Sequence, residues 1–128
     1  MESVLLVAPR EYGDAFKARL EGLKDLSVSG ATAFVVTDAR SRVYVSHNEY
    51  VSQELEPEEL ERFKTMFGNP VFYTVDFSDI HLCRRVLFAL ADDPALWVDN
   101  DHGTLLSGPD FLDLLRRRPD WDWRRKPG

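Results

Sequence analysis

Apolar and polar positions alternate along this chain with two periods, one typical of strands and one typical of helices. Short runs rich in β-branched and aromatic residues predict strands at 3–8, 32–38, 42–48, 71–77 and 95–100. The first of these runs is continuously apolar, which indicates a strand that is buried on both faces. Only a short polar segment, 38–41, separates the second run from the third, so these two runs are expected to form a hairpin.

Apolar residues at helical spacing predict four helices between these strands. The first carries Tyr12, Phe16 and Leu20 on one face. The second is expected to begin at Pro57 and to end before Gly68. The other two are expected after the capping residues Ser78 and Ser107, and the last of them stops before Pro119.

The order of these elements predicts an α+β fold. The order is β-α-β-β-α-β-α-β-α, which fits one mixed sheet of about five strands with helices packed on it. Its first six elements follow the order of a ferredoxin-like unit. We expect one domain over residues 1–118 and a tail rich in tryptophan and arginine over 119–128.

Charge is distributed unevenly and narrows the choice of partner. The chain of 128 residues has a formal net charge of −6, yet its last 13 positions hold six basic residues. Ahead of them, residues 1–115 hold 10 basic and 20 acidic residues. Such a body repels nucleic acid and attracts proteins with a basic surface. A protein partner is therefore expected and a nucleic acid is not.

The lengths of the apolar stretches and the number of cysteines indicate the cellular location to expect. The longest apolar runs span only a few residues, as at 4–8, whereas a transmembrane helix needs about 20. The N-terminal segment also lacks the basic flank of a signal peptide, because Glu2 stands there. Cys83 is the single cysteine, so no intramolecular disulfide forms. We expect a cytoplasmic protein that does not enter a membrane.

The segment Trp97–Gly108 gathers polar residues behind an apolar run and invites comparison with a calcium loop. Counted from Asp99, Asp101 fits position three and Asp110 fits position twelve. However, Gly103 stands at position five, where a ligand is needed, and Thr104 at position six, where the turn needs glycine. We therefore expect a tight turn after which the chain runs back, and no metal or other cofactor.

Catalytic chemistry has one candidate site. Asp76 and Asp99 end two strands that are expected to be parallel neighbours joined by a helix, and His81 lies in the first turn of that helix. Ligands in α/β sheets bind at the carboxyl ends of strands, so these three residues predict an Asp/His enzyme or small-ligand site. Solvated helix and strand ends explain the same residues. Cys83 is expected in the core, and no nucleophile-elbow or phosphate-loop motif occurs.

Two segments are candidates for contact with a partner. The first is the acidic stretch 49–61, whose like charges a basic partner would relieve. The second is the tail, because tryptophan and arginine are enriched at binding hot spots. The alternative is that the two tryptophans are buried and attach the tail to the body. Together with the polar turn, these segments give the predicted contact residues Glu54, Glu58, Glu59, Glu61, Asp99, Asp101, Trp121 and Trp123.

The chain resembles, in type, the small immunity proteins of bacterial polymorphic toxin systems. The resemblance lies in its size, acidity, α+β outline and lack of a catalytic motif. It implies an inhibitor whose acidic face docks on the cationic active site of a toxin, and it transfers no individual residue. The alternatives are the Asp/His site of Asp76, His81 and Asp99, and a structural or regulatory subunit.

Overall fold

The computed structural model describes residues 2–22, 27–29, 33–38, 41–47, 55–100 and 104–123. Within these residues the helices are α1 (Gly13–Glu21), α3 (Pro57–Phe67), α4 (Ile80–Leu90) and α5 (Gly108–Arg117), and a short 3-10 turn, Arg10–Tyr12, precedes α1. The strands are β1 (Glu2–Pro9), β2 (Ser27–Ser29), β3 (Ala33–Asp38), β4 (Ser41–His47), β5 (Pro70–Phe77), β6 (Trp97–Asp99) and β7 (Leu105–Ser107). These elements confirm the α+β class, a single sheet, and all five strands and four helices expected from the sequence.

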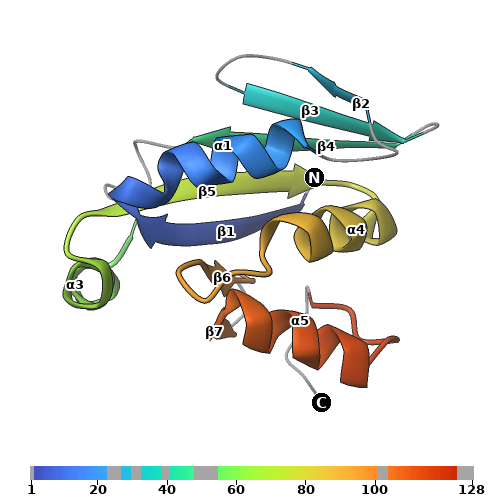
Figure 1. The fold of residues 1–128 in the computed structure, drawn as a ribbon. Coiled ribbons are helices and arrows are strands. Elements are labelled where there is room, and N and C mark those ends of the chain that lie inside the picture. The colour runs from blue at the N-terminus through green and yellow to red at the C-terminus, as the bar shows by residue number, and fades with distance from the viewer. Residues whose placement is uncertain are drawn as a thin grey trace.

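The sheet contains seven strands in the order β2-β3-β4-β5-β1-β6-β7 (Figure 1). The two strands that the sequence did not predict, β2 and β7, are each three residues long. Every pair of neighbours is antiparallel, so the expected mixed sheet is wrong in this respect. The reason is that β5 enters between β4 and β1, which run in the same direction, and is therefore antiparallel to both.

The spatial order also differs from a ferredoxin-like unit. In that arrangement the first strand lies between the third and fourth strands of the β-α-β-β-α-β series. Here the fourth strand of the series, β5, lies between the third, β4, and the first, β1. β1 and β5 pair along their whole length, from Glu2 opposite Phe77 to Pro9 opposite Pro70. This long pairing makes β5 and β1 the central strands of the molecule.

One face of the sheet carries the main core. Helices α1, α4 and α5 cover this face (Figure 1), and their apolar sides are fully buried against it. Val4 and Leu6 of β1 and Val75 and Phe77 of β5 point into this core because alternate residues of a strand face the same side. Cys83 of α4 is buried there as well, which confirms its expected place in the core.

Helix α3 packs on the opposite face of the sheet. Phe63 of α3 meets Phe72 of β5 edge to face, with 5.7 Å between ring centroids, and Val7 of β1 completes this smaller cluster. The alternate residues of β1 are thus buried on both faces, as its continuous apolar run predicts. Gly68 ends α3 with a positive φ of 72°, a conformation that glycine adopts without strain.

The described helices are all too short or too polar to cross a membrane. The longest of them, α3 and α4, have 11 residues each, about half the length that a bilayer requires.

Candidate functional site

The outer side of α3 presents a row of carboxylates to solvent. Glu58, Glu59 and Glu61 are all exposed, and Glu58 and Glu59 lie in the first turn of the helix. None of these three side chains forms an ion pair with another described residue. Glu54, which the sequence adds to this surface, lies outside the described residues. We call Glu58, Glu59 and Glu61 the acidic face of α3.

Packing holds this acidic face in a fixed orientation. Phe63 on the inner side of α3 is 1% exposed, and Leu60 and Phe67 pack beside it. Burying one phenylalanine contributes about 1.5–3 kcal/mol, so the helix is anchored to the sheet by its apolar side. Negative charge in the first turn also stabilises the helix through its dipole. The carboxylates are therefore positioned by the fold.

The chain runs back after the polar segment that follows Trp97, as expected, although the turn itself, 101–103, lies outside the described residues. β6 and β7 pair antiparallel, with Asp99 opposite Leu105. The Asn100 side chain is 1% exposed; its Oδ1 accepts the Thr104 N–H at 2.9 Å, and its Nδ2 donates to the Trp123 carbonyl at 2.6 Å. Asp101 of the predicted contact set lies outside the described residues. Asn100 thus ties the hairpin to the C-terminal segment.

Asp76 and Asp99 lie on the same face of the sheet but not in contact. β5 and β6 run parallel to each other, as expected, but β1 lies between them, so the prediction that they are neighbours is wrong. Two strand spacings place these carboxylates about 10 Å apart or more. Asp76 accepts a short hydrogen bond from the Ser3 hydroxyl of β1. His81, the third residue of the predicted catalytic set, does not lie between these two carboxylates.

His81 lies on the other side of the sheet. α4 packs on the face to which Val75 and Phe77 point, whereas Asp76 between them points to the face of α3. The backbone N–H of His81 donates to Asp79 Oδ1 at 2.9 Å, which makes Asp79 the N-cap of α4 instead of the expected Ser78. The structure therefore does not bring Asp76, His81 and Asp99 together into one site.

Asp79 has a second partner on the sheet. The Ser41 hydroxyl of β4 donates to Asp79 Oδ2 at 2.8 Å. This hydrogen bond, followed by the backbone N–H groups of His81 and Leu82, lowers the pKa of the Asp79 carboxyl because each donor stabilises the charged form. Burial raises the pKa of the Cys83 thiol. A thiol in such surroundings is a poor nucleophile at neutral pH.

The two tail tryptophans pack against the body. Trp123 is 1% exposed, and its ring lies 5.8 Å from Phe77 and 6.4 Å from Phe111, measured between centroids. Trp121 is half-buried, with its ring 5.9 Å from Phe111. Trp123 therefore belongs to the core, and a partner could reach it only if the core opened. Trp121 remains accessible in part.

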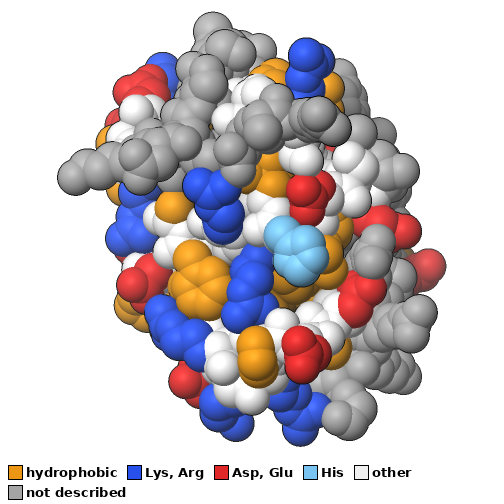
Figure 2. Space-filling view, turned by 90° about the vertical axis from the view of Figure 1, so that its right-hand side faces the viewer, with side chains coloured by type: hydrophobic (Ala, Val, Ile, Leu, Met, Phe, Trp, Pro, Cys, Tyr) orange, Lys and Arg blue, Asp and Glu red, His pale blue; other side chains and the backbone are white. Residues whose placement is uncertain are grey.

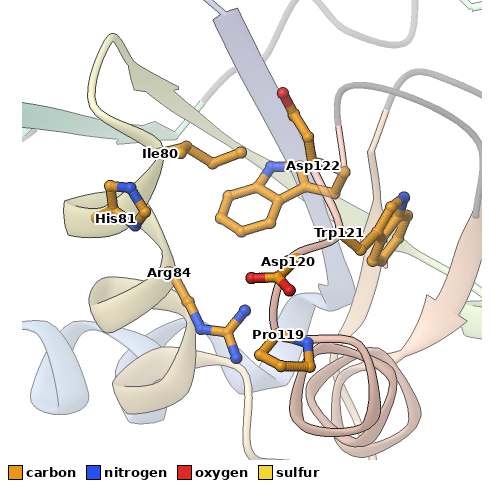
Figure 3. A pocket seen from close by; sticks show the side chains of 8 residues that line it. Ile80, His81, Arg84, Pro119, Asp120, Trp121 and Asp122 are labelled. Atoms are coloured by element: carbon orange, nitrogen blue, oxygen red, sulfur yellow. The ribbon is translucent and has the colours of Figure 1, made fainter.

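A pocket of about 180 Å³ lies between the first turns of α4 and the segment that follows α5 (Figure 3). His81 contributes to its rim, next to Arg84 and opposite Asp120. The sequence singled out His81 and Trp121 but not Arg84 or Asp120, because nothing in their spacing indicates that α4 and the tail lie side by side. The alternation of aspartate and tryptophan at 120–123 is the one signal that marks this segment.

Metal-ligating side chains do not cluster in the part of the chain that the structure describes: no group of three or more His, Cys, Asp or Glu residues could hold an ion there. Comparison of the chain with protein-family models, curated proteins and solved structures finds no match.

Proposed function

We propose that this chain is a small acidic protein-binding module whose partner carries a basic surface, in the manner of an immunity-type inhibitor of a basic toxin. The observation that supports the proposal is the acidic face of α3. Its three carboxylates are exposed, lack an ion-paired cation among the described residues, and stand on a helix that Phe63 anchors to the sheet. A basic partner relieves their mutual repulsion on binding.

The mechanism under this proposal is electrostatic and steric. Fixed negative potential steers a cationic partner and raises the association rate, while the docked module covers the surface beneath it. The charges on α3 need no rearrangement before contact, because the helix is already packed. The chain as a whole is also acidic, with a net charge of −6, so long-range attraction acts in the same direction.

An enzyme site at Asp76, His81 and Asp99 has less support. β1 separates the two aspartates, and His81 lies across the sheet from them. General acid–base catalysis needs its groups within hydrogen-bond reach of one substrate, directly or through a water. The three residues therefore do not form one acid–base site. No contact in the described part of the chain points specifically to a structural or regulatory subunit.

The test is charge reversal on α3. A tagged chain is used to isolate and identify a basic partner from the native host, and binding of the purified pair is then measured. The triple variant Glu58→Lys, Glu59→Lys and Glu61→Lys is expected to slow association at least tenfold, and the wild-type association rate should fall with added salt.

The matched control reverses the same number of carboxylates elsewhere. Glu11, Asp14 and Glu21 are exposed on or beside α1, on the opposite face of the sheet from α3. Their change to lysine alters the net charge equally and should slow association much less. An equal effect of the two triple variants, or an unchanged complex after reversal on α3, would reject the acidic face as the contact surface.

A further inference from the structure

The pocket beside α4 combines features that the proposed function does not use. Figure 2 shows the side of the molecule that lies on the right in Figure 1, where basic and acidic side chains lie among hydrophobic ones. α4 supplies Ile80, His81 and Arg84 to the lining of the pocket, and the segment after α5 supplies residues 119–123. Among these, the Asp122 carboxylate points away from Arg84 and Asp120 in Figure 3. The two walls come from parts of the chain more than 30 positions apart and are joined by the core beneath them.

Opposite charges face each other across this pocket without meeting. In Figure 3 the Arg84 guanidinium and the Asp120 carboxylate point toward one another from the two walls. No hydrogen bond or ion pair joins them, and within the described residues the Asp120 carboxylate has no partner of either kind. A cation and an anion held slightly apart suit a ligand that carries both charges.

One contact with α5 and one within α4 hold Arg84 in place. Its Nη2 donates to the Leu115 carbonyl at 2.8 Å, and its Cζ lies 5.3 Å from the centroid of the Phe88 ring. The fork of a guanidinium has five N–H donors, so donors remain for an anionic group. Arg84 is half-buried, which restricts its movement toward Asp120. The positive charge on this wall is thus positioned before any ligand arrives.

Size and lining limit the ligand further. A volume of about 180 Å³ lies below the roughly 300–1,000 Å³ of most drug-sized ligand sites, so the ligand is small. Ile80, Pro119 and the ring of Trp121 give the pocket an apolar part beside the charges of Arg84 and Asp120. This combination matches a small molecule with one cationic, one anionic and one apolar group.

We propose that this pocket binds a small zwitterion of the α-amino acid class. The ligand carboxylate accepts hydrogen bonds from Arg84, its ammonium group donates to Asp120, and its side chain lies against Trp121 and Ile80. Hydrogen bonds between charged partners are stronger than neutral ones, so both charges contribute to affinity. The proposal does not depend on the acidic face of α3, which lies on the other face of the sheet.

Three related probes test the proposal on the unmodified chain. L-valine carries both charges, N-acetyl-L-valine lacks the cation, and L-valinamide lacks the anion. L-valine is expected to bind saturably with a Kd of about 1 mM or tighter, and each blocked probe at least tenfold more weakly. Calorimetry gives the affinities, and NMR shifts of the Trp121 indole and the Arg84 side chain report the location.

Variants separate the pocket from nonspecific effects. Asp120→Asn and Arg84→Gln are each expected to weaken L-valine binding at least tenfold, while the controls Asp92→Asn and Arg62→Gln, at exposed positions outside the pocket, leave it unchanged. Asp120 is exposed and bonded to no described group, so its change keeps the test valid if Arg84→Gln impairs folding.

Several results would overturn the proposal. They are the absence of saturable L-valine binding up to about 50 mM, well above the expected Kd, equal affinity for the three probes, or unchanged binding in Asp120→Asn. Binding of L-valinamide as tight as that of L-valine would indicate a simple cation site and would equally reject the zwitterion. None of these results bears on the charge-reversal experiment on α3, so the two proposals fail separately.

Discussion

At the scale of single residues, buried polar groups and close backbone contacts place the tightest limits on this fold. Asn100 is the one described polar side chain that is fully buried, and both ends of its amide are used. A buried amide is costly unless it is hydrogen-bonded, so its two partners, Thr104 and Trp123, must stay in register with it. A residue that the sequence marks only as part of a polar turn therefore joins three segments of the chain.

Removal of the Asn100 amide should be costly. Asn100→Ala leaves the Thr104 N–H and the Trp123 carbonyl without their partner, and we expect the free energy of unfolding to fall by about 2–3 kcal/mol. Asn100→Asp keeps an acceptor for Thr104 but turns an anion toward the Trp123 carbonyl, so it should also destabilise. Urea unfolding measures both changes. A loss below about 0.5 kcal/mol for Asn100→Ala, the level of ordinary surface substitutions, would contradict this account.

Gly108 allows a close backbone approach. A Cβ on Gly108 would stand 1.8 Å from the carbonyl oxygen of Ala91, and the Gly108 N–H donates to the Leu96 carbonyl at 2.7 Å. Because the obstacle is backbone, Gly108→Ala should lower the free energy of unfolding by about 3 kcal/mol. The matched control is Gly13→Ala, also at the first residue of a helix, where a Cβ would meet only the Tyr73 hydroxyl at 3.4 Å.

The Gly13→Ala control should be neutral or slightly stabilising, because alanine has fewer unfolded conformations than glycine. Thermal melting of the two variants beside the unmodified chain gives the comparison. Equal melting temperatures for the two glycine variants would show that the contact between Gly108 and Ala91 relaxes at little cost.

At the scale of elements, hydrophobic spacing and caps predict helix positions well. Pro57 begins α3 and Ser107 caps α5, as expected, and the Ser107 hydroxyl accepts the Asp110 N–H at 3.3 Å. The cap of α4 is one residue later than expected, because Asp79 receives a hydrogen bond from Ser41 of β4. Ser41 is 38 positions away in sequence, so local pattern alone could not distinguish Asp79 from Ser78.

The Asp79 cap makes the free energy of unfolding depend on pH in the acidic range. Its folded pKa is lowered from the ordinary value of 3.8, mainly by the Ser41 hydroxyl, so its contribution is present above that value and is lost as pH falls through the folded pKa. Asp79→Ala should cost about 1 kcal/mol near neutral pH through loss of the cap. Asp79→Asn retains an oxygen that can cap the helix but has no carboxyl group that can take up a proton.

Unfolding free energies measured from pH 6 down to pH 2 should therefore decline less steeply in Asp79→Asn than in the unmodified chain below about pH 4. Ser41→Ala is the partner control, since it removes the first cause of the lowered pKa and leaves the carboxylate in place. Identical pH profiles for Asp79→Asn and the unmodified chain would refute the assignment of this titration to Asp79.

At the scale of the whole molecule, element order did not determine strand order. The sequence predicts five of the seven strands from apolar runs or from alternating apolar and polar positions, and it misses β2 and β7. The insertion of β5 between β4 and β1 depends on long-range pairing that no local pattern records. The same limit applies to the site. Asp76 and Asp99 lie at the ends of their strands as expected, yet β1 separates them, whereas packing of α4 against the tail places Arg84 and Asp120 on facing walls of one pocket.

The C-terminal segment closes the core of the molecule, and its removal should be correspondingly severe. Trp123 lies between Phe77 of β5 and Phe111 of α5, and its carbonyl is bound by Asn100. Trp123→Ala should lower the free energy of unfolding by about 3–5 kcal/mol, a large part of the 5–15 kcal/mol typical of a domain. Trp121→Ala, whose side chain is half-buried, should cost about 1–2 kcal/mol. Urea unfolding at fixed pH tests this ranking. Similar losses for the two variants would contradict it, because they would mean that both rings attach the segment equally and that the contacts of Trp123 with Phe77 and Asn100 give it no greater weight than Trp121.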